Sequence, residues 1–333
     1  MNTPFRTALS PVSAPFQISH DNQLLLIGSC FTEHIGQKLA NYKFRTLTNP
    51  YGIVYNPWSI VQCIDRLCAG NQLFEPADLF ENAGLWHSWE HHGSFSKPDK
   101  KETLKAINSA YLEAEEALKI TDVLLLTFGT AEVFTLRSTG QVVANNHKMP
   151  GTWFDQRRLS VTEIVEKTLE VLDRLAQLRA SAPVKVILTV SPVRHLRHGL
   201  VENQRSKATL ILACEKICQH QASAQYFPAY ELLVDDLRDY RFYAADMVHP
   251  SAVAVDYVWQ FFSETFFSEP TNRLIDRIGK VLAGFQHRPF NPQTAPHQDF
   301  LRQQLALIAS LKQEYQRLDF EKEASFFKAS LSQ

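Results

Sequence analysis

Short apolar segments, most of them without polar interruptions, alternate with longer segments of helical periodicity along the chain before His249. Uninterrupted apolar segments are typical of strands that are buried on both faces of a parallel sheet. They predict strands at residues 24–27, 44–47, 123–128, 184–190 and 225–227. The periodic segments predict helices at residues 32–40, 57–69, 102–118, 161–180 and 204–221.

This alternation of strands and helices predicts a doubly wound α/β fold with a parallel sheet. In such sheets, ligands bind beyond the carboxyl ends of the strands. Four of the predicted strands end in polar or glycine-bearing sequence, namely "GSC", "NPYG", "GTAE" and "SPVRH". We therefore expect the functional site where these four segments meet.

The C-terminal part of the chain predicts helices only, at residues 252–267, 272–283 and about 298–327. The Pro-rich segment "HRPFNPQTAP" separates the last two and breaks any continuous helix. In the last helix, apolar residues recur at helical spacing: Phe300, Leu301, Leu305, Ile308 and Leu311. This stripe must pack on the α/β body or on a second subunit, so a homodimer through the C-terminal helices is one expected partnership.

Composition narrows the class of protein. The 333 residues are 45% hydrophobic, and 34 Lys and Arg nearly balance 35 Asp and Glu, so no net field favours nucleic acid or an anionic membrane as a partner. The N-terminal sequence does not resemble an export signal, and no apolar segment is long enough to span a bilayer. The five cysteines are irregularly placed and predict reduced thiols, hence a cytoplasmic protein. We expect no cofactor.

The segment "RFYAADMVHPS" contains the first candidate for chemistry. Asp246 and His249 are three residues apart, so one turn brings both side chains to the same side. An Asp that orients an imidazole is what an activated serine requires, and Ser29 follows the first predicted strand. The alternative is a helix N-cap followed by a surface histidine.

A serine nucleophile also needs hydrogen-bond donors for the oxyanion. The backbone N–H groups of Ser29 and Cys30 open a helix, which favours negative charge there. Further candidates lie directly after the second and third predicted strands: the backbones of Gly52, Gly129 and Thr130, and the side-chain amides of Asn49 and Asn56. Ordinary turn chemistry explains each of these residues equally well.

Three other polar clusters are candidates for binding. Asn145 and His147 in "VVANNHKMP", and Arg194 and His195 in "SPVRHLRHG", suit recognition of a polar or anionic substrate. Turn formation and pairing with nearby acids are the alternatives. In "WHSWEHHGSF", His87, His91 and His92 would hold a metal only if the segment were helical, and Gly93 favours a loop or hairpin. We therefore predict no metal site.

Several blocks, in this order, resemble one known family: "LLIGSCFTEHIG", "NPYGIVYNPWSI", "WHSWEHHGSFS", "LLLTFGTAEVF", "VVANNHKMP", "LTVSPVRHLRHGLVENQRSKATL" and "YFPAYELLVDDLRDYRFYAADMVHPS". Together they resemble the GSCFA domain family, which is similar to the SGNH (GDSL-type) hydrolases. The resemblance spans residues 22–259. It implies a flavodoxin-like α/β/α sandwich over residues 22–268, with residues 1–21 as an N-terminal extension and 269–333 as a C-terminal helical extension.

The same resemblance implies roles for individual residues. It places the nucleophile at Ser29, the orienting acid at Asp246, the base at His249 and an oxyanion-hole glycine at Gly52. The SGNH pattern has Gly-Asp-Ser at the first block, where this chain has Ile-Gly-Ser. Its third block has an Asn that completes the oxyanion hole, where this chain has Ala131. Thr130, Asn145 or His147 would have to substitute for that Asn.

The sequence thus predicts a serine esterase that acts on a small ester, such as an O-acyl carbohydrate or metabolite. Ser29 is the expected nucleophile, and Cys30 is expected to point about 100° away, into the packing of helix against sheet. Transfer of the acyl group to another acceptor is a close variant. A non-catalytic ligand-binding protein on the same fold, and a metal-dependent enzyme using the three histidines, are the rival classes.

Overall fold

A parallel five-stranded sheet forms the centre of the computed structural model, which describes residues 6–180 and 182–331. Its strands are β1 (Gln23–Gly28), β2 (Arg45–Thr48), β5 (Val123–Phe128), β9 (Lys185–Val190) and β10 (Ala224–Phe227), in the order β10-β9-β5-β1-β2. In chain order this is the 2-1-3-4-5 arrangement of flavodoxin-like folds, whose ligand crevice lies where the order reverses, between β1 and β5. All five predicted strands are confirmed.

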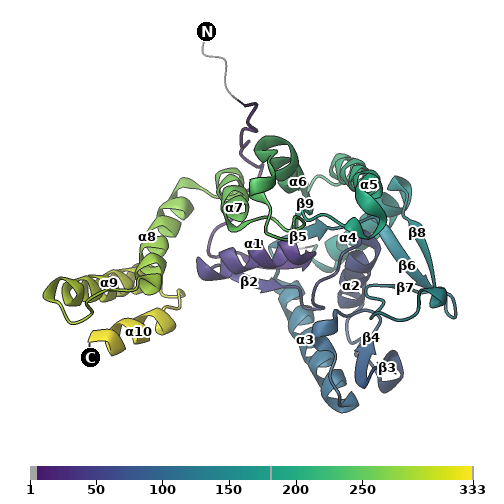
Figure 1. The fold of residues 1–333 in the computed structure, drawn as a ribbon, viewed down its shortest axis with the longest axis horizontal. Coiled ribbons are helices and arrows are strands. Elements are labelled where there is room, and N and C mark those ends of the chain that lie inside the picture. The colour runs from purple at the N-terminus through teal and green to yellow at the C-terminus, as the bar shows by residue number, and fades with distance from the viewer. Residues whose placement is uncertain (1–5, 181, 332–333) are drawn as a thin grey trace, which may run out of the picture.

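Helices cover both faces of this sheet (Figure 1). Neighbouring residues of a strand point to opposite faces, so Leu25 and Ile27 join one apolar cluster while Leu24 and Leu26 join another. The first cluster is completed by α2 (Pro57–Ala69), α3 (Lys100–Ile120), α4 (Val161–Leu178) and α5 (Gly199–His220). The second is completed by α1 (Cys30–Asn41) and α7 (Ala252–Phe266). The predicted α/β/α sandwich is therefore confirmed.

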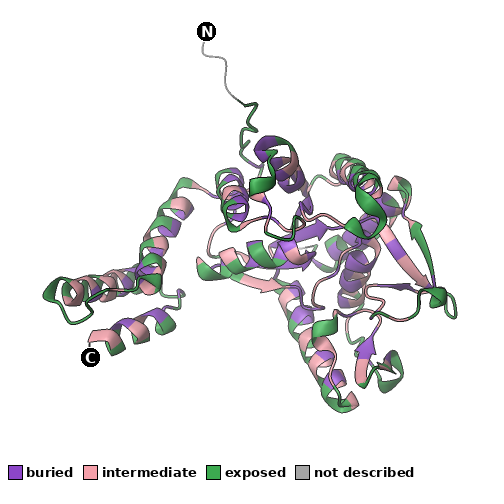
Figure 2. Ribbon diagram, viewed as in Figure 1, coloured by how far each residue is buried: buried purple, intermediate pink, exposed green. Residues whose placement is uncertain are grey.

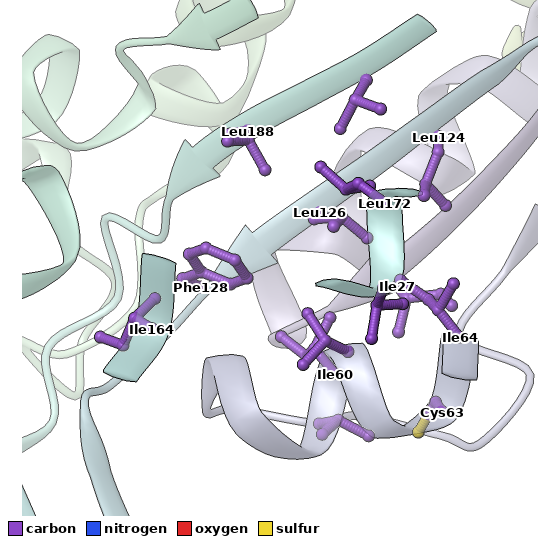
Figure 3. Packing of buried hydrophobic residues seen from close by; sticks show 14 of the residues in the cluster. Ile27, Ile60, Cys63, Ile64, Leu124, Leu126, Phe128, Ile164, Leu172 and Leu188 are labelled. Atoms are coloured by element: carbon purple, nitrogen blue, oxygen red, sulfur yellow. The ribbon is translucent and has the colours of Figure 1, made fainter. Parts of the chain in front are cut away.

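The central strands are buried (Figure 2), and apolar side chains of strands and helices pack together on one face of the sheet (Figure 3). Leu124, Leu126 and Phe128 of β5 are all fully buried, with side chains of α2 and α4 against them. Hydrogen-bonding side chains start the helices, because the first backbone N–H groups of a helix have no partner within it. Ser29, Asn56, Asp99, Ser160 and Ser251 cap α1, α2, α3, α4 and α7 in this way.

Two small antiparallel sheets lie outside the predicted pattern. One is the hairpin of β3 (Leu79–Asn82) and β4 (Leu85–Ser88), and the other joins β6 (Glu132–Leu136), β7 (Val142–Val143) and β8 (Phe154–Arg158). The strands are short, and the hairpin turn uses Ala83 at a φ of 51°, where Asn or Asp would have given a recognisable turn signal. The segment containing His87 and His91 is accordingly a hairpin and loop, as Gly93 suggested.

The C-terminal helices differ from the prediction. The expected single helix over residues 298–327 is two helices, α9 (Ala295–Glu314) and α10 (Glu321–Leu331), which follow α8 (Glu269–Gln286). The turn between them buries Leu318 and Phe320, and the side chain of Asp319 accepts a hydrogen bond from the N–H of Glu321. This turn contains neither Gly nor Pro, so no local residue signals the break between the helices.

Helices α8, α9 and α10 enclose an apolar cluster of their own and stand to one side of the sandwich (Figure 1). Tyr42 contacts that cluster and stacks on Trp259 of α7, with ring centroids 5.4 Å apart. The ammonium of Lys43 lies 2.7 Å from the buried carboxylate of Glu323. The C-terminal unit is thus joined to the sandwich at the end of α1, away from the carboxyl edge of the sheet.

The remaining helical segments are single turns or short helices: η1 (Pro76–Asp78), η2 (Gly93–Phe95), η3 (Gly151–Trp153), η4 (Leu196–His198), α6 (Ala229–Glu231), the π-helix η5 (Leu232–Leu237) and η6 (Tyr240–Phe242). None of the helices in the described ranges has both the length and the apolar character that crossing a membrane requires.

Gly28 ends β1 at a point where the backbone has no room for a side chain. A Cβ atom there would lie 2.5 Å from the carbonyl oxygen of Thr127 and 2.7 Å from Oγ1 of Thr32. Because the first of these is a backbone atom of the neighbouring strand, it cannot move aside cheaply. Glycine is required at this position by packing against β5.

We therefore predict that Gly28→Ala lowers the free energy of unfolding by about 1–3 kcal/mol, the cost of overpacking a rigid site. Urea denaturation followed by circular dichroism measures the change. Gly151→Ala is the matched control, because a Cβ atom at Gly151 would meet nothing within 4 Å. Equal stability of the two variants would contradict this interpretation of the β1–β5 contact.

Candidate active site

A pocket of 420 Å³ opens at the carboxyl edge of the sheet, where β1, β5 and β9 end. Segments that are far apart in the sequence line it: Ser29, Cys30, Ile53, Tyr55, Gly129, Ser191, Val193, Arg194, His195, Val248 and His249. Three of the four strand-end segments expected from the sequence, "GSC", "GTAE" and "SPVRH", contribute to this wall, as does the segment that carries Asp246 and His249. The fourth, "NPYG", does not, and Ile53 and Tyr55 directly after it line the pocket instead. The crevice lies at the switch point that the strand order predicts.

Ser29 forms the corner between β1 and α1. Its Oγ accepts a hydrogen bond from the N–H of Phe31 at 3.3 Å, so the side chain caps the helix, and the residue is only 1% exposed. Its own N–H lies 3.3 Å from the carbonyl oxygen of Thr127. Ser29 is therefore at the floor of the pocket and at the positive end of the α1 dipole.

Asn49 pins this corner from the side of β2. Its Oδ1 accepts a hydrogen bond from the backbone N–H of Gly28 at 2.9 Å. Its own backbone N–H donates to the carbonyl oxygen of Leu26 at 2.8 Å. Its φ of 49° lies in the left-handed region, which Asn tolerates better than most residues. Asn49 thus fixes the backbone that leads into Ser29 and does not line the pocket.

Asp246 and His249 form a hydrogen-bonded pair at the rim. Nδ1 of His249 lies 2.6 Å from Oδ2 of Asp246, while Oδ1 accepts hydrogen bonds from the N–H groups of Val248 and His249 at 2.9 and 3.0 Å. These backbone donors and the imidazole lower the pKa of the Asp246 carboxyl to about 2. The carboxylate is therefore ionised at neutral pH and orients the imidazole through Nδ1, which leaves Nε2 for proton transfer.

Ser29 and His249 share the pocket without a hydrogen bond between their side chains in the described structure. The histidine is on an exposed turn that contains Met247 at a φ of 58°, and its side chain is 42% exposed. The backbone of this turn is tied to the opposite wall, where the N–H of Arg194 donates to Val248 at 3.2 Å. Catalytic hydrogen bonds are often longer before a substrate binds.

Four of the predicted oxyanion donors are already engaged, and the first of them is the N–H of Ser29, which donates to the carbonyl oxygen of Thr127. The N–H of Gly52 donates to Asn49 at 2.7 Å, and the N–H groups of Gly129 and Thr130 donate to the carbonyl oxygen of Tyr55 at 2.7 and 3.1 Å. Gly52 also packs directly on the Cβ atom of His92 and is absent from the residues that line the pocket. These hydrogen bonds hold the loops together, so the structure does not support the prediction that these amides bind an oxyanion.

Cys30 does not follow the sequence expectation. It lines the pocket beside Ser29 and is half-buried, so it is not enclosed in the packing of helix against sheet. Burial raises the pKa of the Cys30 thiol. A thiol at neutral pH is a poor nucleophile, because the thiolate is the reactive form.

Of the predicted substrate-binding residues, Arg194 and His195 line the pocket. The guanidinium of Arg194 stacks over the ring of Tyr243 at 4.0 Å and lies 3.4 Å from the carbonyl oxygen of Met247. Burial, followed by the charge of Lys207, lowers the pKa of His195. His195 is therefore a neutral polar group at neutral pH.

The other predicted binding residues lie elsewhere. Asn56 caps α2 by accepting a hydrogen bond from Ser59, and Asn145 accepts one from the N–H of His147. Nε2 of His147 lies 2.8 Å from the carbonyl oxygen of Ser88, within a cluster of aromatic and histidine rings outside the pocket. These three residues stabilise loops, which was the alternative that their turn-like sequences allowed.

His87 and His91, in and directly after β4, contact different residues. Nδ1 of His87 lies 2.7 Å from Oγ of Ser96, whereas His91 is buried and stacks on Tyr51 with ring centroids 4.9 Å apart. Burial lowers the pKa of His91 to about 3. Within residues 6–180 and 182–331, no group of three His, Cys, Asp or Glu side chains is arranged to hold a metal ion.

Sequence reasoning missed Lys207, which lies fully buried beneath the pocket at 1% exposure. Its Nζ donates hydrogen bonds to the carbonyl oxygens of Gly129 and Ser191, both at 2.6 Å. The available signal was its place on α5 between Asn203 and Leu210, at the spacing of one buried helix face. A lysine on an apolar face is unusual enough to have been singled out.

We predict that Asn49→Ala lowers the free energy of unfolding by about 1–3 kcal/mol, because the buried N–H of Gly28 then lacks its acceptor. Thermal and urea unfolding measure this change. Asn71→Ala is the control, since Asn71 also has a left-handed φ, of 52°, but is exposed. Similar losses in the two variants would show that backbone conformation, and not the hydrogen bond to Gly28, is responsible.

Comparison with curated proteins and with solved structures gives only distant similarity. No curated protein matches the chain. Among solved structures, a carbohydrate esterase family 3 protein from Talaromyces cellulolyticus has a TM-score of 0.35 and 8% identity, covering 78% of this chain and 98% of that one. A mutant acetyl esterase with acetate ion has a TM-score of 0.36 and 8% identity, covering 78% and 99%. Both TM-scores are too low to inform function.

The family profiles match far more of the sequence. The profile described as "GSCFA family" matches residues 23–262, and that of the "GSCFA domain protein, C-terminal domain" matches residues 278–333. The first alone covers more than half of the chain and includes Ser29, Asp246 and His249. The chain belongs to the GSCFA family.

Proposed function

We propose that this chain is a serine-dependent hydrolase of small esters, such as O-acyl carbohydrates or metabolites, with Ser29 as nucleophile, His249 as base and Asp246 as the orienting acid. The observation that carries the proposal is the 2.6 Å contact between His249 Nδ1 and Asp246 Oδ2 at the rim of the pocket whose floor is Ser29. An imidazole fixed through Nδ1 by an ionised carboxylate has the orientation that a serine nucleophile requires.

In the proposed reaction, Oγ of Ser29 attacks the acyl carbon while Nε2 of His249 takes the hydroxyl proton. The tetrahedral intermediate collapses, the bond to the alcohol oxygen breaks, and the imidazolium returns that proton to the leaving alcohol. Water then attacks the acyl-enzyme, giving its proton to His249, and Ser29 leaves with that proton as the carboxylic acid is released. Asp246 stays ionised throughout and stabilises the imidazolium.

The start of α1 is the best placed source of oxyanion stabilisation. Cys30 supplies the first N–H of this helix, which has no acceptor within the helix, and lines the pocket next to Ser29. Helix dipoles favour negative charge at this end. In this proposal the Cys30 backbone, itself one of the candidates from the sequence, takes this role in place of Ser29, Gly52, Gly129 and Thr130, and the Cys30 thiol stays protonated.

Two features of the pocket wall relate to the two parts of the proposed ester, its acyl group and its alcohol portion. The pocket of 420 Å³ has the aliphatic side chains of Ile53, Val193 and Val248 in its wall, which suit an alkyl chain. Arg194 and His195 lie on the same wall and offer donors for hydroxyl or carboxylate groups of the alcohol portion.

We predict that a fluorophosphonate probe forms one covalent adduct with the wild-type protein, on Ser29. Ser29→Ala abolishes the adduct, and His249→Ala slows its formation by at least about 100-fold, since general-base catalysis typically contributes that much. Intact-mass spectrometry followed by peptide mapping gives the rate and the site of labelling.

The control for this experiment is His34→Ala. His34 lies within electrostatic range of His249 but has no place in the proposed proton transfer. Labelling of His34→Ala should stay within a few-fold of wild type. A folded wild-type protein that forms no adduct would overturn the proposed function.

Asp246→Asn should lower the labelling rate by about 10²–10⁴-fold at every pH from about 5 to 9, because the carboxylate, with a pKa of about 2, is ionised over that whole range. Asp239→Asn is a matched control, since this aspartate lies nearby and also accepts a backbone N–H, from Arg241 at 2.9 Å. If Asp246→Asn reacts like wild type, the Asp246–His249 pair serves only to stabilise the turn.

A second candidate function is binding of a small ligand without catalysis. It is favoured by Ala131 in the place of the SGNH asparagine and by the engagement of Ser29 Oγ with Phe31 instead of His249. A protein of this kind would bind a small ester without turnover, and isothermal titration with product analysis would identify it.

Acyl transfer would require exclusion of water, and the pocket is open to solvent at its rim, where His249 is 42% exposed.

A further inference from the structure

The amine of Lys207 lies beneath the pocket floor and joins two of its walls. It reaches from α5 to the carbonyl oxygen of Gly129, directly after β5, and to that of Ser191, directly after β9, at 2.6 Å each. Both of these residues line the pocket. The side chain of Lys207 therefore fixes the spacing between the ends of β5 and β9, which form the floor of the pocket.

A buried amine without an anionic partner is unusual, because burial of a charged group is costly unless it is paired. Lys207 is 1% exposed, and the hydrogen-bond acceptors of its Nζ among the described residues are two backbone carbonyl oxygens, not carboxylates. Two short hydrogen bonds to carbonyl oxygens favour the ammonium form, while burial lowers the pKa of the amine to about 7. A group that destabilises the fold in this way is expected to serve the site above it.

The position of Gly129 relates this clamp to Ser29. A Cβ atom at Gly129 would lie 3.3 Å from the Cβ of Ser29 and 3.0 Å from the carbonyl oxygen of Tyr55, so the peptide at Gly129 packs directly on the proposed nucleophile. A shift of Gly129 would thus displace Ser29 or open a gap beside it. The charge of Lys207 also acts on the neighbouring thiol of Cys30, whose pKa it lowers against the larger, opposite effect of burial.

We propose that Lys207 is a positioning residue of this site: its buried ammonium clamps the carbonyl oxygens of Gly129 and Ser191, holds the pocket floor against Ser29 and favours the negative charge that develops there. The catalytic part of this inference rests on the proposed function, whereas the clamp itself does not. No substrate contact is assigned to Lys207.

The titration of Lys207 can be distinguished from the titration of the side chains around it. The titratable side chains that face it are Cys30 on α1, His195 after β9 and Tyr230 on α6, whose ring centroid is 5.7 Å from Nζ. Burial raises the pKa values of Cys30 and Tyr230 above their ordinary values of 9.0 and 10.0 and lowers that of His195 below 6.5. A loss of charge between about pH 7 and pH 9 is therefore assigned to Lys207.

The first test measures the rate of fluorophosphonate labelling of Ser29 against pH in wild type, Lys207→Met and Leu210→Ala. Methionine keeps the length and volume of the lysine without its donors. Leu210 is buried three residues along the same helix face and has no hydrogen-bonding side chain, so Leu210→Ala reproduces a loss of stability alone.

Wild type should lose labelling rate as pH rises from about 7 to 9, because the ammonium that favours the developing charge is then deprotonated. Lys207→Met should be slower than wild type at pH 7 by roughly 10- to 100-fold and should show no such decline. Leu210→Ala should keep the wild-type profile per folded molecule. Equal rates and profiles in wild type and Lys207→Met would overturn the catalytic part of the inference.

The second test does not depend on reactivity. Hydrogen–deuterium exchange of the segments around Gly129 and Ser191 should be faster in Lys207→Met than in wild type, by at least about tenfold, under conditions where α3 exchanges equally in both proteins. Unchanged exchange in these two segments would overturn the clamp. If wild type fails to react with the probe, the proposed function fails while this exchange measurement still decides the role of Lys207.

Discussion

The position of the proposed nucleophile depends on one close contact between backbones, where β1 ends against β5. Gly28 has no space for a side chain because the carbonyl of Thr127 occupies it, and its N–H is bound by the side chain of Asn49 from the side of β2. The backbone therefore leaves the sheet at Gly28, and Ser29, the next residue, caps α1. The glycine, the asparagine and the serine act as one unit.

Hydrogen bonds to backbone groups also determine the arrangement of the rest of the pocket. The carbonyl oxygen of Tyr55 accepts the N–H groups of Gly129 and Thr130, and Lys207 binds the carbonyl oxygens of Gly129 and Ser191. These hydrogen bonds keep buried polar groups paired and hold the strand-end loops at fixed distances. They also engage the N–H groups of Gly129 and Thr130, which their place after the third predicted strand had made candidate oxyanion donors. The helix end at Cys30 is what remains for that role.

The sandwich could be predicted because strands buried on both faces leave uninterrupted apolar segments, and helices leave a clear period. The two antiparallel sheets could not, since β7 has only two residues and the β3–β4 turn uses Ala83 in an uncommon conformation. The break between α9 and α10 is set by burial of Leu318 and Phe320, a tertiary effect without a local signal. Sequence patterns identify elements better than the turns that packing imposes.

For the site, the sequence predicted which segments meet but not which atoms remain available. Arg194 and His195 line the pocket as expected, while Asn56, Asn145 and His147 stabilise turns, because Asn and His pair readily with nearby backbone groups. Cys30 lines the pocket because the first residue of α1 faces the strand ends. Lys207 was missed although its place on the buried face of α5 was a signal, and its two backbone partners could be identified only from the folded structure.

The most direct test of the central claim is to isolate the acyl-enzyme. Wild-type protein is mixed rapidly with p-nitrophenyl acetate, quenched in acid and digested, and the acetyl group is located by peptide mass spectrometry. An activated serine at the end of β1 predicts a burst of about one equivalent of p-nitrophenol per chain and an acetyl group on Ser29. Acetylation of Cys30 in place of Ser29, or no burst from the folded protein, would contradict it.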